Sequence, residues 1–492
     1  MRRYFLIYVA VLAVFGAGID LALKRGKRLE GERAAIVTAM PAAHTGASGA
    51  REATPVLRGD PAAFAQSGWH PPGLPVLQIA VILLAARLLG GLFRRLHQPA
   101  VIGEIVAGIL LGPSLLGAAA PRIFGFLFPT SSLSALKILS EIGVVIFLFV
   151  VGLDLDLARL RRKAETAVVV SHASIVLPYF FGVVLSLFLY DELAPAGVTF
   201  LAFALFMGIA MSITAFPVLA RILHERRLAG TPLGITAITC AAVDDVTAWS
   251  ILAVVVAVVK SESVLICAAR IGAVLLFVVL MLGVVRRLLP RVFAFASSRG
   301  ATGTATMAGA LIVLLASALT TRAIGIHALF GAFLAGAVMP RDQKLRDTVT
   351  ARLQKVSSLL LLPLFFAFTG LRTEIGLLND ARSWFLCTVI VLVATVGKLG
   401  GSMLAARLTR LGWIDSFALG ALMNTRGLME LIALNVGYEL GILSPRIFAM
   451  MVLMALATTL ATGPLLSLAD VLRKRTAAET IREVSLAPAE DA

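Results

Sequence analysis

Two adjacent carboxylates offer the most informative chemistry in this sequence. Asp244 and Asp245 occur in the segment AAVDDVTAW, near the first third of a long apolar stretch. A charge in hydrocarbon is costly unless it faces water or a partner. Two carboxylates that border one cavity cannot both ionise cheaply, and their oxygen atoms suit a hard monovalent cation. The pair therefore predicts a site that binds protons and a cation in competition. The structural alternative is a pair that is only hydrogen-bonded inside a helix bundle.

A single ammonium group within an apolar stretch is the second candidate. Lys398 lies about midway along VLVATVGKLGGSML, beside glycines that would let another helix approach closely. Such a charge needs a counter-ion. We predict Asp244 for that role, because the two charges would neutralise each other in the ion-free state. The alternative is a lysine whose stem lies in the membrane while its ammonium reaches the interface.

A polar interruption in MSITAFPVLARIL, residues 211–223, predicts a broken helix. Pro217 removes a backbone hydrogen bond, and the hydroxyls of Ser212 and Thr214 can bond the groups that are freed. A broken helix exposes carbonyls and dipole ends at the site. We therefore expect Thr214 and the carbonyls around it to contact the cation.

A second interruption, LMNTRGLMELIALN at residues 422–435, has the same character. Asn424 and Thr425 are predicted to support the break as Ser212 and Thr214 do in the first interruption. Arg426 and Glu430 are four residues apart, which places them on one face of a helix. We interpret this pair as a structural ion pair.

Composition indicates which elements must position these residues. The 492-residue chain is 59% hydrophobic and 15% charged, with a mean hydropathy of +0.94, well outside soluble usage. Apolar runs of about twenty residues can cross the hydrocarbon of a bilayer. The sequence predicts an all-α polytopic membrane protein with about thirteen core spans. They are expected at 76–94, 99–117, 138–156, 165–190, 197–222, 232–259, 264–285, 303–321, 326–340, 357–372, 384–406, 416–438 and 446–471.

The basic residues predict the orientation of these spans, because cytoplasmic loops are enriched in Lys and Arg. Basic clusters fall on alternate loops and in the C-terminal tail, which we therefore place in the cytoplasm. The clusters lie at 94–95, 159–163, 221–227, 286–299, 341–355, 407–410 and 473–475. The net charge of +16 then reflects topology and attraction to anionic lipid rather than nucleic-acid binding.

The chain divides into four predicted parts. Residues 1–23 have a basic start followed by an apolar run, which suits a signal peptide or an extra anchor helix. Residues 24–75 show no sustained period and are predicted to form a flexible extracytoplasmic loop. Residues 76–471 form the transmembrane domain, and 472–492 are a short cytoplasmic tail.

Glycine-containing segments suggest an internal duplication. GEIVAG at 103–108 is followed by GLD at 152–154, and GAFLAG at 331–336 is followed by GLR at 370–372. By the predicted topology, the corresponding helices run in opposite directions. Inverted repeats are typical of secondary transporters, which bind substrate near the midplane. Small residues that only pack helices closely would give a similar pattern.

Nothing in the sequence indicates a resident cofactor. The three cysteines show no paired spacing, the six histidines are scattered, and no Gly-rich βαβ fingerprint occurs. We expect no metal centre beyond the site of the transported cation.

Six segments together resemble one known family. They are RLHQPAVIGEIVAGILLGPSLLG, GVVIFLFVVGLDLD, AMSITAFPVLARIL, AAVDDVTAW, FFAFTGLRT and NTRGLMELIALNVG, and the similarity covers residues 76–471. The combination is similar to the monovalent cation:proton antiporter-2 family, including its plant cation/proton exchanger branch.

The resemblance implies a fold and a mechanism. We expect the sodium/proton antiporter fold, with inverted repeats, two crossed discontinuous helices, elevator-type alternating access and a homodimer. It also implies that Asp245 is the essential carrier of ion and proton. The acidic residue before it, Asp244, favours the electrogenic members, and Lys398 resembles the core lysine of that group. The plant-branch motifs leave potassium as plausible as sodium.

Other functions predict different features. A cation-coupled symporter of a small solute on the same fold is the main alternative. A polytopic membrane enzyme with buried aspartates would carry them on two facing helices, and a channel would need a continuous pore. We therefore expect a transporter and not an enzyme, integral to the cell (inner) membrane, whose partners are a monovalent cation, protons and membrane lipid.

Overall fold

The computed structural model describes residues 2–39, 73–96, 98–129, 131–154, 164–260, 264–298, 303–340 and 342–486. These residues form helices and connecting turns, with no strand among them. Ten helices in the described ranges are long and apolar enough to cross a membrane, and three shorter apolar helices accompany them. The thirteen predicted spans coincide with these ten and three, so the all-α polytopic prediction is confirmed.

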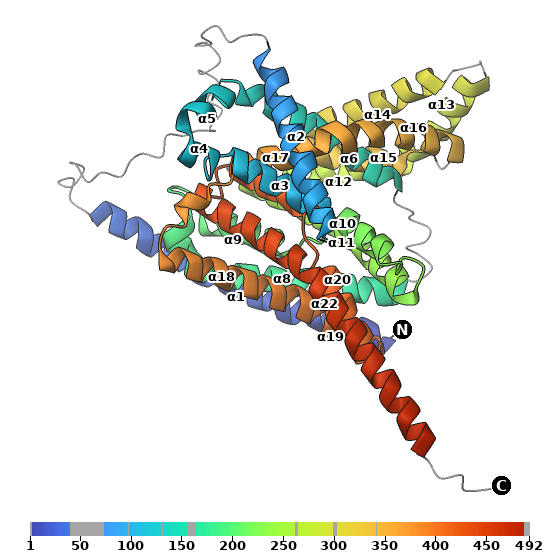
Figure 1. Cartoon of the computed structure of the whole chain (residues 1–492). Coiled ribbons are helices and arrows are strands. Elements are labelled where there is room, and N and C mark those ends of the chain that lie inside the picture. Colours follow the sequence, from blue (N-terminus) through green and yellow to red (C-terminus); the bar gives the residue numbers. More distant parts are fainter. Residues whose placement is uncertain are drawn as a thin grey trace.

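The helices pack as two groups, which Figure 1 shows as an upper and a lower layer. We call the first the scaffold group. It consists of α2 (Leu74–Arg95), α3 (Ala100–Leu111), α4 (Leu116–Ala119), α5 (Pro121–Leu127), α6 (Leu133–Asp154), α12 (Val264–Leu280), α13 (Arg286–Ser298), α14 (Gly303–Ile324), α15 (Ala328–Val338), α16 (Gln343–Val356) and α17 (Leu362–Leu371). Short π-helical turns join α12 to α13 at Met281–Val285 and α16 to α17 at Ser357–Leu361.

The second group, which we call the core group, contains the two predicted interruptions. It consists of α8 (Ala164–Leu193), α9 (Phe200–Ser212), α10 (Phe216–Glu225), α11 (Pro232–Val259), α18 (Ala381–Thr395), α19 (Gly401–Leu408), α20 (Trp413–Met423), α21 (Leu428–Glu439) and α22 (Pro445–Leu486). A π-helical turn at Val396–Gly400 joins α18 to α19.

The predicted glycine segments produce matching contacts in the two halves of the scaffold group. A Cβ atom on Gly108 of α3 would lie 2.0 Å from the carbonyl oxygen of Ala367 on α17. A Cβ atom on Gly336 of α15 would lie 2.0 Å from that of Phe149 on α6. Helix α3 therefore packs against α17, and α15 packs against α6, so each contact joins the two halves. Only glycine allows the backbones to come so close. The paired glycine segments therefore make the same kind of close contact in both halves, as the predicted duplication requires.

The two broken helices of the core group meet at their breaks. The chain leaves helical geometry between α9 and α10 and again between α20 and α21. The backbone N–H of Ala215 in the first break donates to the carbonyl of Thr425 in the second, at 2.9 Å. Gly427 has a φ of 153°, a conformation that side-chain-bearing residues rarely adopt. Both predicted interruptions and their crossing are therefore present.

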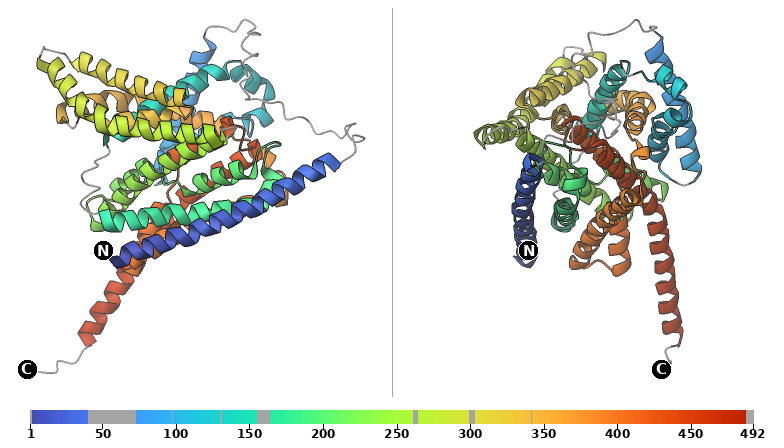
Figure 2. Two further views of the ribbon diagram at one scale, coloured as in Figure 1. Left: turned by 180° about the vertical axis from the view of Figure 1, so that it is seen from behind. Right: turned by 90° about the vertical axis from the view of Figure 1, so that its left-hand side faces the viewer.

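The N-terminal segment differs from its prediction. Helix α1 spans Arg2–Ala39, so residues 24–39 are helical where a flexible loop is predicted. It runs beside α8 in the core group (Figure 2). Glu30 accepts the N–H of Phe200 at 3.0 Å, and Arg33 donates to the carbonyls of Tyr190 and Ala194. These contacts at the α8–α9 turn explain why the helix continues past its apolar run. The rest of the predicted loop, 40–72, lies outside the described residues.

The C-terminal tail also begins as helix. Helix α22 continues to Leu486, well beyond the predicted end of the last span at residue 471. This extension projects away from the bundle in Figure 1.

Candidate functional site

Asp244 is fully buried and fully hydrogen-bonded. It lies on α11, and its carboxylate accepts hydrogen bonds from Ser171 at 2.5 Å and Ser174 at 2.7 Å, both on α8. Thr214, in the first break, donates at 2.6 Å. The ammonium of Lys398 lies 2.9 Å away and completes a buried ion pair. Three hydroxyls and one cation therefore compensate this charge.

Lys398 lies in the π-helical turn between α18 and α19, and π turns inside helices frequently occur at functional sites. Besides Asp244, its ammonium donates to the carbonyls of Ser174 and Ser212. Gly397 and Gly401 beside it lie against α8: a Cβ on Gly397 would be 3.0 Å from Pro178, and one on Gly401 would be 3.1 Å from the carbonyl oxygen of Ala173. The predicted pairing with Asp244 is confirmed, and the interfacial lysine is the wrong interpretation.

Asp245 has different surroundings from those of its neighbour. It is 2% exposed, and neither of its carboxylate oxygens accepts a well-aligned hydrogen bond from the described residues. It faces a small void lined by Ile213 of the first break and Met429 of α21, with Ala248, Trp249 and Leu252 of its own helix. The two carboxylates are predicted to border one cavity, and that expectation is wrong for this conformation. Neighbouring positions on a helix point about 100° apart, so Asp244 faces α8, Thr214 and the π turn that carries Lys398, while Asp245 faces the void between the broken helices.

The C-terminal end of the half-helix α9 is held by two cations. The guanidinium of Arg426 donates to the carbonyl of Ala210 at 3.0 Å and to that of Met211 at 2.6 Å. Lys398 donates to the next carbonyl, that of Ser212. The last carbonyls of a helix lack intrahelical partners and form the negative end of its dipole. Arg426 and Lys398 therefore stabilise the break itself.

The Arg426–Glu430 pair is present, and it is entirely buried. Glu430 lies 3.3 Å from the guanidinium of Arg426, and both side chains are 0% exposed. Neither oxygen of Glu430 accepts a well-aligned hydrogen bond from the described residues. The ion pair agrees with the structural interpretation, although the contacts of Arg426 with α9 extend its role beyond one helix face.

The second break is supported by residues other than those predicted. Thr459 of α22 accepts the backbone N–H of Arg426 at 3.1 Å and donates to its carbonyl at 2.7 Å. The hydroxyl of Thr425 lies 3.3 Å from that of Thr462, also on α22. The side-chain amide of Asn424 has no hydrogen-bond partner among the described residues. Its predicted supporting role is therefore wrong here, because α22 satisfies the backbone instead.

At the first break, Ser212 ends one half-helix and Pro217 lies at the start of the next. The hydroxyl of Ser212 donates to the carbonyl of Gly208 at 2.7 Å, one turn back within α9, and not to a group that the break frees. Pro217 is the second residue of α10. The N–H groups of a first helical turn have no intrahelical partner. Pro217 therefore starts the second half-helix instead of removing a bond from a continuous one.

Sequence reasoning missed four hydroxyl residues of this network: Ser171, Ser174, Thr459 and Thr462. A signal was available, because SHAS at 171–174 and TTLAT at 458–462 place small polar residues one helical turn apart within apolar spans. Serine and threonine are also common in transmembrane helices as plain packing residues. Their spacing alone does not distinguish the two uses.

No group of three His, Cys, Asp or Glu side chains in the described ranges is placed to hold a metal ion. Among the described residues at the breaks and on α11, the carboxylate oxygens of Asp245 and Glu430 and the amide oxygen of Asn424 are buried without a well-aligned hydrogen bond. Backbone and carboxylate oxygens are the ligands that a hard monovalent cation prefers.

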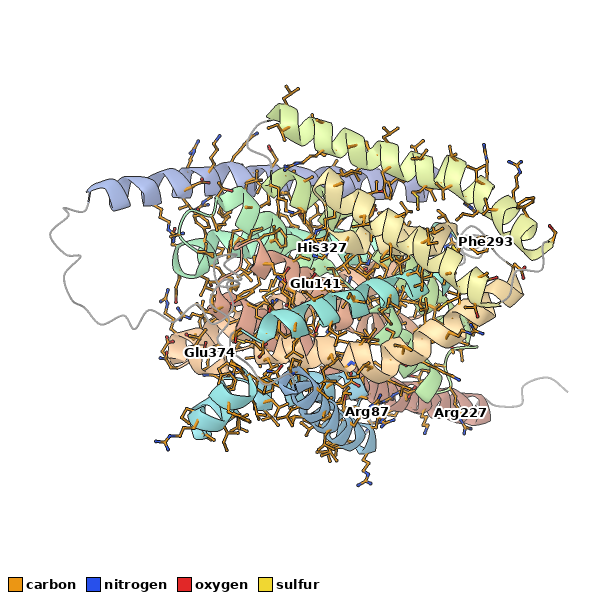
Figure 3. The ribbon with its side chains drawn as sticks, turned by 90° about the horizontal axis from the view of Figure 1, so that it is seen from above. Arg87, Glu141, Arg227, Phe293, His327 and Glu374 are labelled. Carbon is orange, nitrogen blue, oxygen red and sulfur yellow. The ribbon has the colours of Figure 1, made fainter. Side chains whose placement is uncertain are left out.

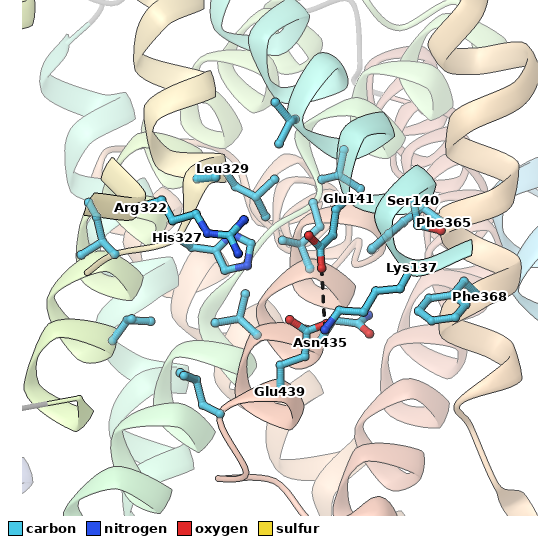
Figure 4. A pocket seen from close by; sticks show the side chains of 18 of the residues that line it. Lys137, Ser140, Glu141, Arg322, His327, Leu329, Phe365, Phe368, Asn435 and Glu439 are labelled. Carbon is cyan, nitrogen blue, oxygen red and sulfur yellow. Dashed lines mark ion pairs between the residues drawn. The ribbon is translucent and has the colours of Figure 1, made fainter. Parts of the chain in front are cut away.

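A larger cavity of about 340 Å³ lies between the scaffold and core groups. We call it the charged cavity. Its scaffold side includes Lys137, Glu141, Arg322, His327 and Arg372, and its core side includes Lys260, Asn435 and Glu439. Figure 3 shows Glu141 and His327 inside the bundle, and Figure 4 shows the cavity from close by. The apolar residues Val256 and Ile432, one turn along α11 and α21 from the void at Asp245, separate it from that void.

Comparisons with known proteins agree with this geometry. The family model described as "Sodium/hydrogen exchanger, transmembrane" matches residues 80–469. The chain is 42% identical over 393 residues to the Na(+)/H(+) antiporter NhaS4 of Synechocystis sp., covering 80% of this chain and 96% of that protein. It is 40% identical to cation/H(+) antiporter 17 of Arabidopsis thaliana and 33% identical to K(+)/H(+) antiporter 1 of Saccharomyces cerevisiae. These matches cover 80% and 82% of this chain, but about half of each relative, 48% and 47%.

A solved structure has the same fold. The sodium proton antiporter MjNhaP1 from Methanocaldococcus jannaschii superposes with a TM-score of 0.54 over 80% of this chain and 98% of that chain, at 15% sequence identity. The family model matches residues 80–469, and the two broken helices meet at their breaks. This chain is a multi-pass membrane protein that belongs to the sodium/hydrogen exchanger family.

Proposed function

We propose that this protein exchanges a monovalent cation, Na⁺ or K⁺, for protons, with Asp245 as the carrier. One observation supports this most strongly. Asp245 is a buried carboxylate without a well-aligned hydrogen bond in the described structure, and it lies beside the break of a discontinuous helix. A carboxylate in such a place is stable when it is protonated or when it holds a cation. It therefore alternates between these two ligands.

Asp244 and Lys398 compensate charge beside that carrier. In the ion-free, protonated state their ion pair neutralises both groups. When a cation approaches, Thr214 is the group able to couple the two aspartates, because it belongs to the break that faces Asp245 and it bonds Asp244. Cation entry then weakens the Asp244–Lys398 pair, and return of protons restores it.

The motion we propose is elevator-type alternating access. The carrier, the breaks and Lys398 all belong to the core group, while the charged cavity lies on the boundary with the scaffold group. Close glycine contacts pack α3 against α17 and α15 against α6 within the scaffold group. A core that slides as a unit against a rigid scaffold would carry the site from one membrane face to the other.

Electrogenic exchange follows if two protons move per cation. Each cycle then transfers one net charge, worth about 2.3 kcal/mol per 100 mV of membrane potential. The acidic residue at position 244 supports this choice, since it adds a second titratable group to the site. The relatives named above include a Na(+)/H(+) and a K(+)/H(+) antiporter, so both ions remain candidates.

The proposed orientation places the C-terminus in the cytoplasm of the cell. The basic clusters at 221–227 and 473–475 then face inward. The end of the bundle that carries Lys137, Lys260 and the charged cavity faces outward. The homodimer implied by the family resemblance remains part of this proposal.

The test is proton movement in energised everted vesicles that contain the protein. Na⁺, K⁺ and Li⁺ are added separately, and the change in the proton gradient is followed by acridine-orange fluorescence. We expect dequenching with at least one ion for the wild type and for Asp191→Asn, an exposed control, and none for Asp245→Asn. Retained exchange in Asp245→Asn would exclude Asp245 as the carrier. A proton influx that requires an added organic solute would instead indicate a symporter.

A further inference from the structure

The carboxylates of the charged cavity are already paired. Glu439 of the core group lies 3.2 Å from the ammonium of Lys137 and 3.1 Å from the guanidinium of Arg372, both on the scaffold group. Glu141 lies 3.7 Å from Lys137 (Figure 4). Four cationic side chains but only two carboxylates line this cavity. The cavity therefore has an excess of positive charge.

Two of the four cations have no carboxylate partner. Lys260, at the C-terminal end of α11, and Arg322, at the end of α14, line the cavity as exposed residues, and their side chains form no ion pair or hydrogen bond with the described residues. Although Lys260 is exposed, desolvation by the protein around it and then the positive charges of Arg270 and Arg322 lower its pKa. Both observations describe a place where a negative ion would be stabilised.

Hydrogen-bond donors in the same cavity also lack acceptors. The hydroxyl of Ser140 and the Nε–H of Arg372 are buried without a hydrogen-bond partner in the described structure, and so is the Nδ1 of His327, which donates in one of the two neutral tautomers of the ring. Ser140 is 2% exposed and the side chain of Arg372 is 3% exposed. A buried donor without a partner costs about 1–3 kcal/mol. Figure 4 shows His327 beside Arg322 on one wall, with Ser140 on the opposite one.

We propose that the charged cavity binds a small oxyanion of the phosphate class. Lys260 and Arg322 supply the charge, and Ser140, His327 and the free Nε of Arg372 supply neutral or charged donors. A volume of about 340 Å³ accommodates a tetrahedral oxyanion with its water shell or a lipid phosphodiester. The recognised group is the same in both cases, and the two sources are separated below.

The position of the site predicts an effect on transport, and this consequence rests on the proposed exchange. Lys260 belongs to the core group, whereas Arg322 belongs to the scaffold group. An anion held by both would join the two groups in the conformation described here. By favouring one conformation, it would slow a cycle that needs both.

Binding is tested without reference to transport. The full-length protein in a neutral detergent is heated in Tris phosphate or in Tris chloride of equal ionic strength, so that no transported cation is present. We expect phosphate to raise the unfolding temperature saturably. The double variant Lys260→Gln/Arg322→Gln should weaken the apparent affinity by about tenfold or more, since two charge-assisted hydrogen bonds are lost. Arg122→Gln, which removes an exposed charge from α5, should leave the affinity unchanged.

A second arm replaces phosphate with phosphatidylglycerol in the same detergent. Stabilisation by the lipid alone, lost in the double variant, would identify a headgroup as the oxyanion. An equal effect of chloride, an equal effect in the double variant, or no effect of either phosphate source would overturn the proposal. Because these readouts do not involve exchange, they stand or fall separately from the function of Asp245.

Discussion

At the scale of single residues, two neighbouring aspartates differ in how completely their carboxylates are hydrogen-bonded. Asp244 has three hydroxyls and an ammonium around its carboxylate, while Asp245 accepts no well-aligned hydrogen bond within the described part of the chain. The difference arises from their angular separation on α11. A residue that is already fully bonded is suited to compensate charge, and one that is open is suited to bind an exchanged ion.

Removing one member of the buried Asp244–Lys398 pair should lower the free energy of unfolding. Lys398→Gln leaves the Asp244 charge without its counter-ion at a site that is 0% exposed, which typically costs about 3–5 kcal/mol. We expect a clearly lower unfolding temperature for the detergent-purified variant. The double variant Asp244→Asn/Lys398→Gln should recover much of that loss, because no unpaired charge remains. Equal unfolding temperatures for Lys398→Gln and wild type would show that the pair is not needed in the folded state.

The support of the second break can be tested at Thr459. Thr459→Val keeps the shape but removes the hydroxyl that bonds both the N–H and the carbonyl of Arg426. The buried backbone groups then lack a partner, at about 1–3 kcal/mol each. We expect a lower unfolding temperature and reduced exchange. Thr459→Ser keeps the hydroxyl and should stay close to wild type. If both variants behave alike, the hydroxyl does not hold the break.

At the scale of helices, the close approaches within the scaffold group depend on missing side chains. Gly108→Ala would place a Cβ 2.0 Å from the carbonyl oxygen of Ala367, so α3 and α17 must separate. We expect a marked fall in unfolding temperature. Gly91→Ala in the interior of α2 meets nothing within 4 Å and should be neutral or slightly stabilising, because alanine favours helix. A fall for Gly91→Ala as large as that for Gly108→Ala would contradict the packing argument.

Helix α1 gives a prediction about processing. Its contacts with the α8–α9 turn through Glu30 and Arg33 lie beyond the predicted apolar run. We propose that α1 is a retained anchor rather than a cleaved signal peptide. Intact-mass measurement of the purified protein should then include residues 1–23. A mass that begins after residue 23 would identify a signal peptide.

At the scale of the whole molecule, the sequence predicted the spans well, because twenty-residue apolar runs and glycine spacing are local signals. It also predicted Lys398 as the partner of Asp244, since a lone ammonium in hydrocarbon needs a counter-ion. It could not predict that α22, rather than Asn424, supplies the hydrogen-bond partner of the backbone at the second break. That depends on which distant helix packs there. The helical residues 24–39 were missed for a similar reason, because contacts with other helices rather than their own periodicity hold them.

The central claim is that protons and a cation compete for Asp245. Proton release on addition of the cation measures this competition most directly. The purified protein is held in weakly buffered detergent solution near neutral pH, and Na⁺ or K⁺ is added while pH is recorded. Wild type and the exposed control Asp191→Asn should release protons saturably with one of these ions, and Asp245→Asn should release none. Undiminished release from Asp245→Asn, or no release from wild type with either ion across pH 6 to 9, would contradict the assignment of Asp245 as the carrier.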